Sequence, residues 1–244
     1  MIRWLMPLVA LGGAALGAVA VVAYDRAAPG ALGAADTARV ERVVRDYVLA
    51  HPEIIPEAMQ RLQARESARA VAAVGGDLTR PFGSAWTGNP RGDVTLVEFY
   101  DYNCGYCRAS LPLLKQLVQR DPRLRIVYRE LPILAESSRA AARASLLAAS
   151  QGKFAAFHDA LYAGGPVSDA TIARAAARAG VDPSQGDAFR ARADAEIARN
   201  LKAAGQLGMT GTPSWIVGDR MLAGALPIED IEAAIAAARG KPRT

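Results

Sequence analysis

The chain has 244 residues, of which 51% are hydrophobic and 22% are charged. This length fits one domain of ordinary size with a substantial core, and the composition argues against disorder. Lys and Arg exceed Asp and Glu by 29 to 24, a net charge of +5, and the basic residues are scattered rather than gathered in a run with aromatic residues. We therefore expect a solvated surface and no nucleic-acid partner.

Residues 1–30 contain an uncharged apolar block from residue 4 to residue 24, flanked by Arg3 on one side and Asp25 on the other. About 20 apolar residues suffice to cross a bilayer, and the core of an ordinary signal peptide is shorter, about 7–15 residues. We expect residues 1–30 to be either a signal anchor that tethers the chain to the membrane or a signal peptide that is removed. Either one would export the rest of the chain to a compartment where disulfides persist.

Residues 31–75 predict an N-terminal helical segment that follows a linker rich in Ala, Gly and Pro. Asp36 or Thr37 is the candidate N-cap of its first helix, and Pro52 suits the first turn of the second. Each helix has one apolar face, formed by Val40, Val43, Val44, Tyr47 and Val48 in the first and by Ile55, Ala58, Met59 and Leu62 in the second. Short helices cannot bury such faces alone, so they pack on the main domain, on a membrane or on another copy of the chain. A homo-oligomer through residues 36–73 is thus one expectation.

Residues 76–244 predict the main domain, which belongs to the α/β class. After irregular chain, the apolar run from Val94 to Phe99 is typical of a strand covered on both faces. A helical pattern follows from Gly105 to about Gln119, and Leu124, Ile126 and Tyr128 then alternate as in a second strand. These elements form a βαβ unit.

The rest of this domain predicts a helical insert and a second group of strands. The pattern of residues 136–207 predicts about four helices, separated by glycine-containing breaks. Two short strands about a turn at Gly218-Asp219 and a closing helix with Ile228, Ile231 and Ile235 on one face complete the chain. The predicted order is βαβ, helical insert, ββα.

The only two cysteines, Cys104 and Cys107, lie at the strand-to-helix junction of the βαβ unit. A structural zinc site normally needs four thiolate or imidazole ligands, and His51 and His158 are not at ligand spacing, so we expect no metal site of that kind. Two thiolates could still hold Cu(I). A structural disulfide would close too short a loop to stabilise the fold much.

Redox chemistry is what the CxxC spacing favours. At the start of a helix, free backbone N–H groups and the helix dipole stabilise the thiolate of Cys104, which is the form that attacks a disulfide. Cys107, one turn further, is placed to resolve the resulting mixed disulfide. The dithiol couple is then the catalyst, and no organic cofactor is expected.

Three local motifs resemble the DsbA-like branch of the thioredoxin superfamily, whose members are exported bacterial thiol–disulfide oxidoreductases. They are VEFYDYNCGYC around the cysteines, GMTGTPSWIV around Pro213, and FAAFHDALY from Phe154 to Tyr162. The resemblance covers about residues 76–240. It implies a thioredoxin-like fold with a helical insertion, preceded by the N-terminal helical segment and the apolar block, and a periplasmic location.

The resemblance also assigns roles to single residues. Thr212 and a cis Pro213 would form the loop that binds client proteins beside the sulfurs. Glu98, six residues before Cys104, would be a buried acid, and such a carboxyl could relay the proton that Cys107 gains or loses. Gly105 and Tyr106, the pair between the cysteines, would tune the reactivity of the dithiol.

The predicted function is an exported enzyme that oxidises, reduces or isomerises disulfides in client proteins and works with a membrane redox partner. The CGYC tetrad resembles the DsbC-type isomerases, and the phrase DYVLAHPEIIPEAMQRLQ resembles the Com1- and ScsC-like group. Two alternatives remain open: a Cu(I)-binding or metal-stress protein that uses the same two cysteines, and a non-catalytic holdase whose N-terminal helices bind clients.

Overall fold

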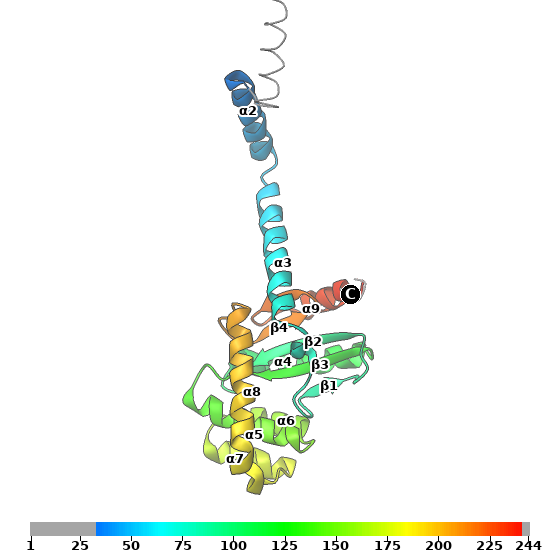
Figure 1. The fold of residues 1–244 in the computed structure, drawn as a ribbon. Helices are drawn as coiled ribbons and strands as arrows, with labels where there is room; N and C mark the ends of the chain where they lie inside the picture. The colour runs from blue at the N-terminus through cyan, green and yellow to red at the C-terminus, as the bar shows by residue number, and fades with distance from the viewer. Residues whose placement is uncertain (1–32, 241–244) are drawn as a thin grey trace, which may run out of the picture. The chain divides into compact units, whose positions relative to one another are not determined.

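The structure is a computed structural model that describes residues 33–240 (Figure 1). The apolar block at residues 4–24 lies outside the described residues. Within residues 33–240, none of the helices combines the length and the apolar character needed to cross a bilayer. The described part of the chain divides into two compact units, residues 33–60 and residues 61–240.

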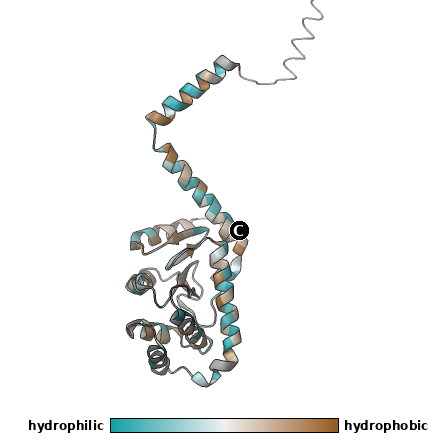
Figure 2. Cartoon of the chain, turned by 90° about the vertical axis from the view of Figure 1, so that its left-hand side faces the viewer, coloured by the Kyte–Doolittle hydropathy of each residue, from teal (hydrophilic) through white to brown (hydrophobic). Residues whose placement is uncertain are grey.

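The described part of the first unit consists of helix α2 (Ala34–Ala50) and the start of helix α3 (Ile54–Val74). The predicted N-cap of α2 is wrong, because Gly33 caps the helix and Asp36 lies inside its first turn, where a carboxylate is favoured by the helix dipole. Pro52 lies in the turn before α3 rather than in its first turn. Polar and apolar residues alternate along α2 (Figure 2).

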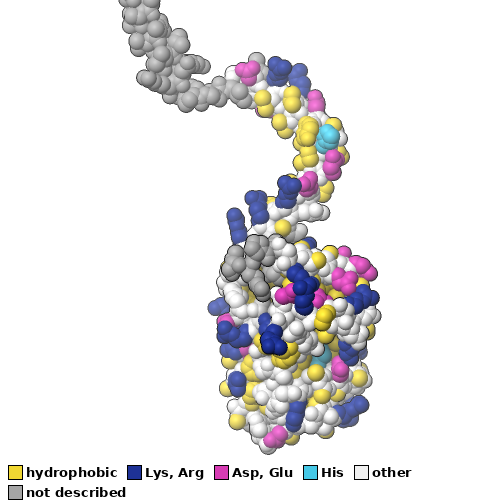
Figure 3. Space-filling view, turned by 90° about the vertical axis from the view of Figure 1, so that its right-hand side faces the viewer, with side chains coloured by type: hydrophobic (Ala, Val, Ile, Leu, Met, Phe, Trp, Pro, Cys, Tyr) yellow, Lys and Arg dark blue, Asp and Glu magenta, His cyan; other side chains and the backbone are white. Residues whose placement is uncertain are grey.

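The apolar side chains of α2 lie on its surface in this structure (Figure 3). Their exposed fractions run from 47% to 67% for Val40, Val43, Val44, Tyr47 and Leu49. The amphipathic pattern of the sequence is therefore present as an exposed apolar face. Large exposed apolar patches of this kind are typical of interaction surfaces.

The second unit is built around a five-stranded sheet of the described residues, with the order β1-β3-β2-β4-β5. Its strands are β1 (Trp86–Gly88), β2 (Val94–Tyr100), β3 (Leu124–Glu130), β4 (Ser214–Val217) and β5 (Arg220–Ala223). Strands β2 and β3 are parallel, and the other pairs are antiparallel. The βαβ, insert, ββα order is confirmed, with β1 as an addition that the sequence pattern did not predict.

The helices of this unit are α4 (Gly105–Arg120), α5 (Glu136–Ser150), α6 (Phe154–Ala163), α7 (Asp169–Ala179), α8 (Gly186–Gln206) and α9 (Ile228–Arg239), with the short 3-10 turns η1 (Gly76–Thr79) and η2 (Pro183–Gln185). Helices α5 to α8 form the insert, and α5, α6 and α7 gather beside one end of α8 (Figure 1).

The C-terminal part of α3, from residue 61 onward, also belongs to this unit. There Ser67 accepts a hydrogen bond from the Met221 N–H at 2.9 Å and donates one to the Asp219 carbonyl at 3.3 Å.

The two faces of the sheet carry separate cores, because successive strand residues point to opposite faces. Leu96 and Tyr100 of β2 pack in one cluster with α4, α6 and α9. Val97 and Phe99 of β2 pack in another with α8 and the end of α3. We call the first the cysteine face and the second the α8 face.

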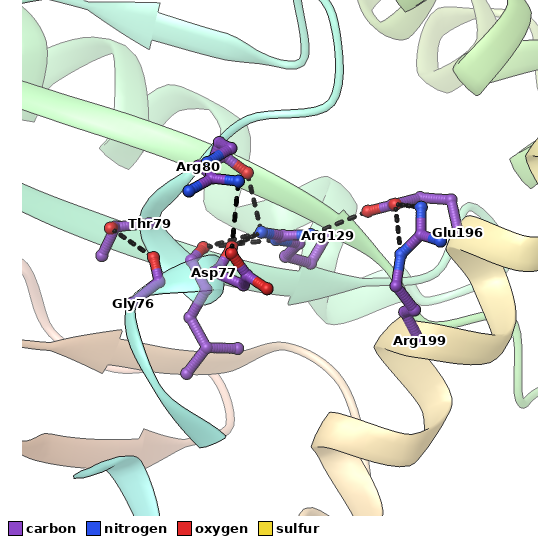
Figure 4. Close-up of polar contacts among 8 residues, drawn as sticks. Gly76, Asp77, Thr79, Arg80, Arg129, Glu196 and Arg199 are labelled. Carbon is purple, nitrogen blue, oxygen red and sulfur yellow. Dashed lines mark hydrogen bonds and ion pairs between the residues drawn. The ribbon is translucent and has the colours of Figure 1, made fainter. Parts of the chain in front are cut away.

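A buried arginine links the α8 face to the turn η1 (Figure 4). The guanidinium of Arg129 on β3 donates to the carboxylate of Glu196 at 2.7 Å and to the carbonyl of Arg80, also at 2.7 Å. It also donates to the carbonyls of Asp77 and Leu78. One charged side chain thus connects strand β3, turn η1 and helix α8.

Candidate active site

The two cysteines lie where β2 ends and α4 begins, as the sequence predicts. Cys104 is the N-cap of α4, and its sulfur accepts a hydrogen bond from the Cys107 N–H at 3.3 Å. Both residues are free thiols in the structure, 5% and 1% exposed, respectively. A thiolate at Cys104 would therefore receive a backbone N–H and the positive end of the helix dipole.

Cys107 lies deeper than Cys104 and is the less easily ionised partner. Burial raises the pKa of the Cys107 thiol far above its usual range, and the nearby Glu98 carboxyl raises it further. A sulfur in this setting is a poor thiolate leaving group, and it departs readily only if a proton reaches it and it leaves as a thiol. Cys107 thus fits the role of the inner, resolving thiol.

Glu98 is on the cysteine face, as the resemblance implied, and is only 2% exposed. Its register neighbours across the sheet are Tyr128 on β3 and Trp215 on β4, both apolar-bodied and buried. Burial raises the pKa of Glu98 well above its usual value, and the charges of Cys104 and Glu130 raise it further. The carboxyl is therefore suited to hold a proton near neutral pH.

Thr212 and Pro213 come from the other end of the chain to the same place. The Thr212–Pro213 peptide bond is cis, as expected. The Cys104 thiol donates a hydrogen bond to the Thr212 carbonyl oxygen at 3.1 Å. A pocket of about 410 Å³ adjoins this loop and is lined by residues 207–214, by residues 221–224 of β5 and the following turn, and by Gln63.

Cys104 itself is only 5% exposed, but the chain segments beside it carry exposed apolar side chains. Tyr106 is 67% exposed, and a side chain added at Gly105 would meet no atom within 4 Å. Ile133 and Leu134, which follow β3, are also exposed, and their backbone N–H groups donate to the buried Asp101 carboxylate at 2.9 and 3.0 Å. Asp101 thereby holds this loop against the strand end that leads into Cys104.

A second buried acid, Glu130, was not predicted from the sequence. The Tyr100 hydroxyl donates a close hydrogen bond to its carboxyl, and burial raises the pKa of Glu130 to about 8 despite hydrogen bonds from Tyr100 and Ser145 that lower it. Among the described residues no cation pairs with Glu98 or Glu130. The sequence does contain a signal that Glu130 is buried, because Glu130 continues the alternation of Leu124, Ile126 and Tyr128 that marks the buried face.

His158 is a buried residue of this cluster, and its Nδ1 lies 3.0 Å from the Tyr102 hydroxyl. Burial lowers its pKa to about 3, with a smaller effect from Lys115, so the imidazole is neutral. His51 is exposed and far from this arrangement in sequence, and its Nδ1 lies 3.3 Å from Glu53. Within residues 33–240 there is no group of three or more His, Cys, Asp or Glu residues that could hold a metal ion.

Fold and site together define a class of protein. A four-helix insert interrupts a βαβ and ββα sheet, a CxxC begins the helix of the βαβ unit, and a cis proline faces the outer sulfur. This is the architecture of a thioredoxin-fold dithiol protein. Residues 95–236 match the model of the DSBA-like thioredoxin domain, and the chain belongs to that family.

Several solved structures resemble the chain over more than half of its length. A thioredoxin-like oxidoreductase from Silicibacter pomeroyi is 42% identical, with a TM-score of 0.61, over 64% of this chain and 92% of that one. Proteus mirabilis ScsC in a transitional conformation is 28% identical, with a TM-score of 0.62, over 87% and 99%. The thiol-disulfide exchange protein alpha-DsbA2 of Wolbachia pipientis is 25% identical, with a TM-score of 0.64, over 72% and 97%.

The N-terminal helices have a match of their own. Residues 36–69 match the N-terminal domain of the copper resistance protein ScsC. This range includes α2 and most of α3. The similarity to ScsC implied by the sequence motif is thus confirmed.

Curated relatives include a different kind of protein. The chain is 33% identical over 158 residues to the Na(+)/H(+) antiporter NhaA 3 of Salinispora tropica and 32% identical over 153 residues to NhaA 1 of Salinispora arenicola. The matches span 62% and 59% of this chain but only about a quarter of each antiporter, 24% and 23%. Antiport activity is therefore not carried over to this chain.

Proposed function

We propose that the protein is a periplasmic thiol–disulfide oxidoreductase that acts on client proteins through Cys104 and Cys107. The observation that carries this proposal is the position of the Cys104 sulfur, which contacts the N-terminus of α4 on one side and the Thr212 carbonyl on the other. A dithiol used only as a structural staple needs neither contact. The periplasmic location is supported by the similarity to ScsC and to a periplasmic thioredoxin-like protein of Salmonella enterica.

The exchange reaction follows from the two environments of the sulfurs. In the oxidising direction, a client thiolate attacks Cys104 of the disulfide form and Cys107 leaves with the electron pair. A second client thiolate then attacks the mixed disulfide and releases Cys104, so the client loses two electrons and the dithiol gains them. Reduction and isomerisation begin instead with attack by the Cys104 thiolate on a client disulfide.

Clients would bind across the exposed apolar surface beside Cys104. Tyr106, Ile133 and Leu134 are exposed apolar side chains, and a pocket adjoins the Thr212–Pro213 loop that contacts the Cys104 sulfur. An unfolded or partly folded client exposes apolar side chains and an extended backbone, which match these two features. A membrane redox partner would use the same surface to reset the dithiol.

The proposal is tested by separating the roles of the two cysteines. Cys107→Ser should trap a mixed disulfide with a client, because the resolving thiol is gone, whereas Cys104→Ser should trap none and should abolish insulin reduction and the refolding of scrambled ribonuclease. Non-reducing gels and the two activity assays give the readout. Trapping by Cys104→Ser instead, or full activity of that variant, would contradict the assignment.

A Cu(I)-binding role is the second candidate, and the description of ScsC as a copper resistance protein favours keeping it in view. However, the matched residues 36–69 contain neither cysteine. Titration of the reduced protein with Cu(I) against a colorimetric chelator distinguishes the two. Tight binding by the wild type and none by Cys104→Ser, together with no disulfide exchange, would establish the metal role.

The N-terminal helices are proposed to form a homo-oligomer through residues 36–73. The exposed apolar face of α2 supports this, because burying it on a second copy would remove Val43, Val44 and Tyr47 from water. Light scattering after size exclusion should show an assembly that Val43→Glu dissociates. A holdase role without catalysis predicts that Cys104→Ser still suppresses client aggregation while the oligomer is intact.

A further inference from the structure

Cys107, the inner cysteine, needs a route by which protons reach its sulfur. Cys107 and Glu98 are 1% and 2% exposed, so neither is open to bulk water. Each catalytic cycle nevertheless adds a proton to Cys107 and removes one. Glu98 can supply the first proton, but it must then be recharged from elsewhere.

A continuous row of buried polar groups begins next to Glu98. The Tyr100 hydroxyl contacts the Glu130 carboxyl and lies 3.2 Å from the Ser145 hydroxyl. The Tyr102 hydroxyl lies 3.0 Å from Ser145 and 3.0 Å from Nδ1 of His158. We call these five side chains the relay chain, and all of them are buried.

Glu98 adjoins the inner end of the relay chain. In the parallel register of β2 and β3, Glu98 pairs with Tyr128 and Tyr100 pairs with Glu130. Glu98 and Glu130 are therefore diagonal neighbours on the cysteine face, close enough that the charge of Glu130 raises the pKa of Glu98. A water molecule between the two carboxyl groups would complete the link between Glu98 and the relay chain.

The outer end of the relay chain meets a pocket of about 250 Å³ between α4, α6 and β1. His158 lines this pocket together with Lys115 and Asp159, whose exposed side chains form an ion pair at 3.2 Å. Nε2 of His158 has no hydrogen-bond partner in the described part of the chain. When Tyr102 donates to Ser145, its oxygen accepts from Nδ1–H, and Nε2 then presents a free lone pair.

We propose that the relay chain carries protons between water in this pocket and the Glu98 carboxyl beside Cys107. The inference rests on the thiol exchange function proposed above. In this proposal Glu130, Tyr102 and His158 are proton-positioning residues that act through Glu98. The unpartnered Nε2 of His158 is the atom that takes up a proton from water. A buried hydrogen-bond chain can move a proton by a concerted shift, without charging any of its hydroxyl groups.

The proton balance of one client oxidation is complete along this route. The Cys104–Cys107 bond breaks, the client sulfur bonds to Cys104, and the Cys107 thiolate takes the proton of Glu98. The Glu98 carboxylate takes a proton from Glu130, which regains one through Tyr100, Ser145 and Tyr102 from His158. His158 is recharged at Nε2 by water. When the membrane partner reoxidises the dithiol, the same proton returns to water in the opposite order.

The test compares two tyrosine variants of the full-length protein. Tyr102→Phe removes a relay hydroxyl and keeps its ring, whereas Tyr162→Phe removes a neighbouring hydroxyl that donates to the Asp101 carbonyl outside the relay chain. Single-turnover reduction of the oxidised protein by a dithiol peptide is followed by tryptophan fluorescence. We expect Tyr102→Phe to be about tenfold slower, and Tyr162→Phe to match the wild type.

Two further measurements separate a proton route from a packing effect. The equilibrium reduction potential in glutathione buffer should be unchanged in Tyr102→Phe, because the route affects rate and not equilibrium. The slow reduction by His158→Ala should be accelerated by imidazole in the buffer, which can enter the pocket and replace the lost ring. Equal slowing by both tyrosine variants, or wild-type rates in Tyr102→Phe, would overturn the relay while leaving the exchange function intact. A wild-type protein without any exchange activity would overturn both.

Discussion

Arg129 and Glu130 are consecutive residues of β3, and they show two ways in which a protein buries charge. The guanidinium of Arg129 donates to the side chains of Glu196 and Asn200 on α8 and to three backbone carbonyls of residues 77–80. Glu130 faces the cysteines, where a tyrosine hydroxyl is its close partner and no cation of the described residues approaches. The compensated charge fastens secondary structure together. The uncompensated one has a shifted pKa and can exchange protons.

Breaking the compensated pair should have the largest effect on stability. Arg129→Met leaves the buried Glu196 with only the exposed Arg199 as a cation partner and leaves the carbonyls of η1 without donors, which should cost about 3 kcal/mol of unfolding free energy. Urea denaturation measures this. Arg123→Met is the control, since its ion pair with Asp93 is exposed and should matter by less than about 1 kcal/mol. Equal losses in the two variants would contradict the contrast.

Removing the uncompensated acid should change how stability depends on pH. The pKa of Glu130 is raised from 4.5 to about 8, so the folded state holds this proton more tightly than the unfolded state. The wild type should then lose stability as pH rises from about 4.5 to about 8, at up to about 1.4 kcal/mol per pH unit from this group. Glu130→Gln should flatten that slope and be a few kcal/mol more stable than the wild type at pH 8.

A second variant sharpens this test. Tyr100 donates a hydrogen bond that lowers the pKa of Glu130, so Tyr100→Phe should raise that pKa further. The loss of stability should then extend to higher pH than in the wild type. Urea titrations at several pH values would reveal the displacement. An unchanged pH profile in both variants would mean that Glu130 does not titrate in this range.

The contrast between the two residues also explains what the sequence could predict. The strand from Val94, the helix after Cys104 and the alternation of Leu124, Ile126 and Tyr128 are local patterns, and the structure has all of them. The roles of Arg129 and Glu130 depend instead on residues 76–80, 196 and 145, which only the folded chain brings to β3. A strand that ends in two charges looks exposed until those elements cover it.

Two smaller features of the fold also depend on contacts that a local sequence pattern does not show. Strand β1 (Trp86–Gly88) has three residues, too few for a pattern to emerge among glycines and prolines, and it exists because β3 offers it an edge. The C-terminal part of α3 lies in the same compact unit as the sheet, and Ser67 of α3 bonds to the β4–β5 hairpin. In both cases a partner distant in sequence decides the outcome.

Adding a cation beside Cys104 should have a moderate effect on the reduction potential of the dithiol. Tyr106→His places an imidazole beside Cys104, and its protonated form would stabilise the thiolate and make the dithiol more oxidising. Because position 106 is 67% exposed, solvent screens the charge, and we expect a shift of only about 30 mV at pH 6, the equivalent of roughly tenfold in the equilibrium constant. The shift should fade by pH 8, above the usual pKa of histidine. Persistence at pH 8 would indicate a packing effect.

Gly105→Ala adds a methyl group without charge at the position before Tyr106, and it should have the smallest effect on stability and none on the reduction potential. Gly105 is the first residue of α4, its φ is not in the left-handed region, and a Cβ there would meet no atom within 4 Å. Gly105→Ala should therefore raise the unfolding free energy by about 0.4–1 kcal/mol through the lower entropy of the unfolded chain. Its reduction potential in glutathione buffer should equal that of the wild type. If Gly105→Ala shifted the potential as much as Tyr106→His does, the shape of the CGYC turn, rather than charge near the thiolate, would control the dithiol.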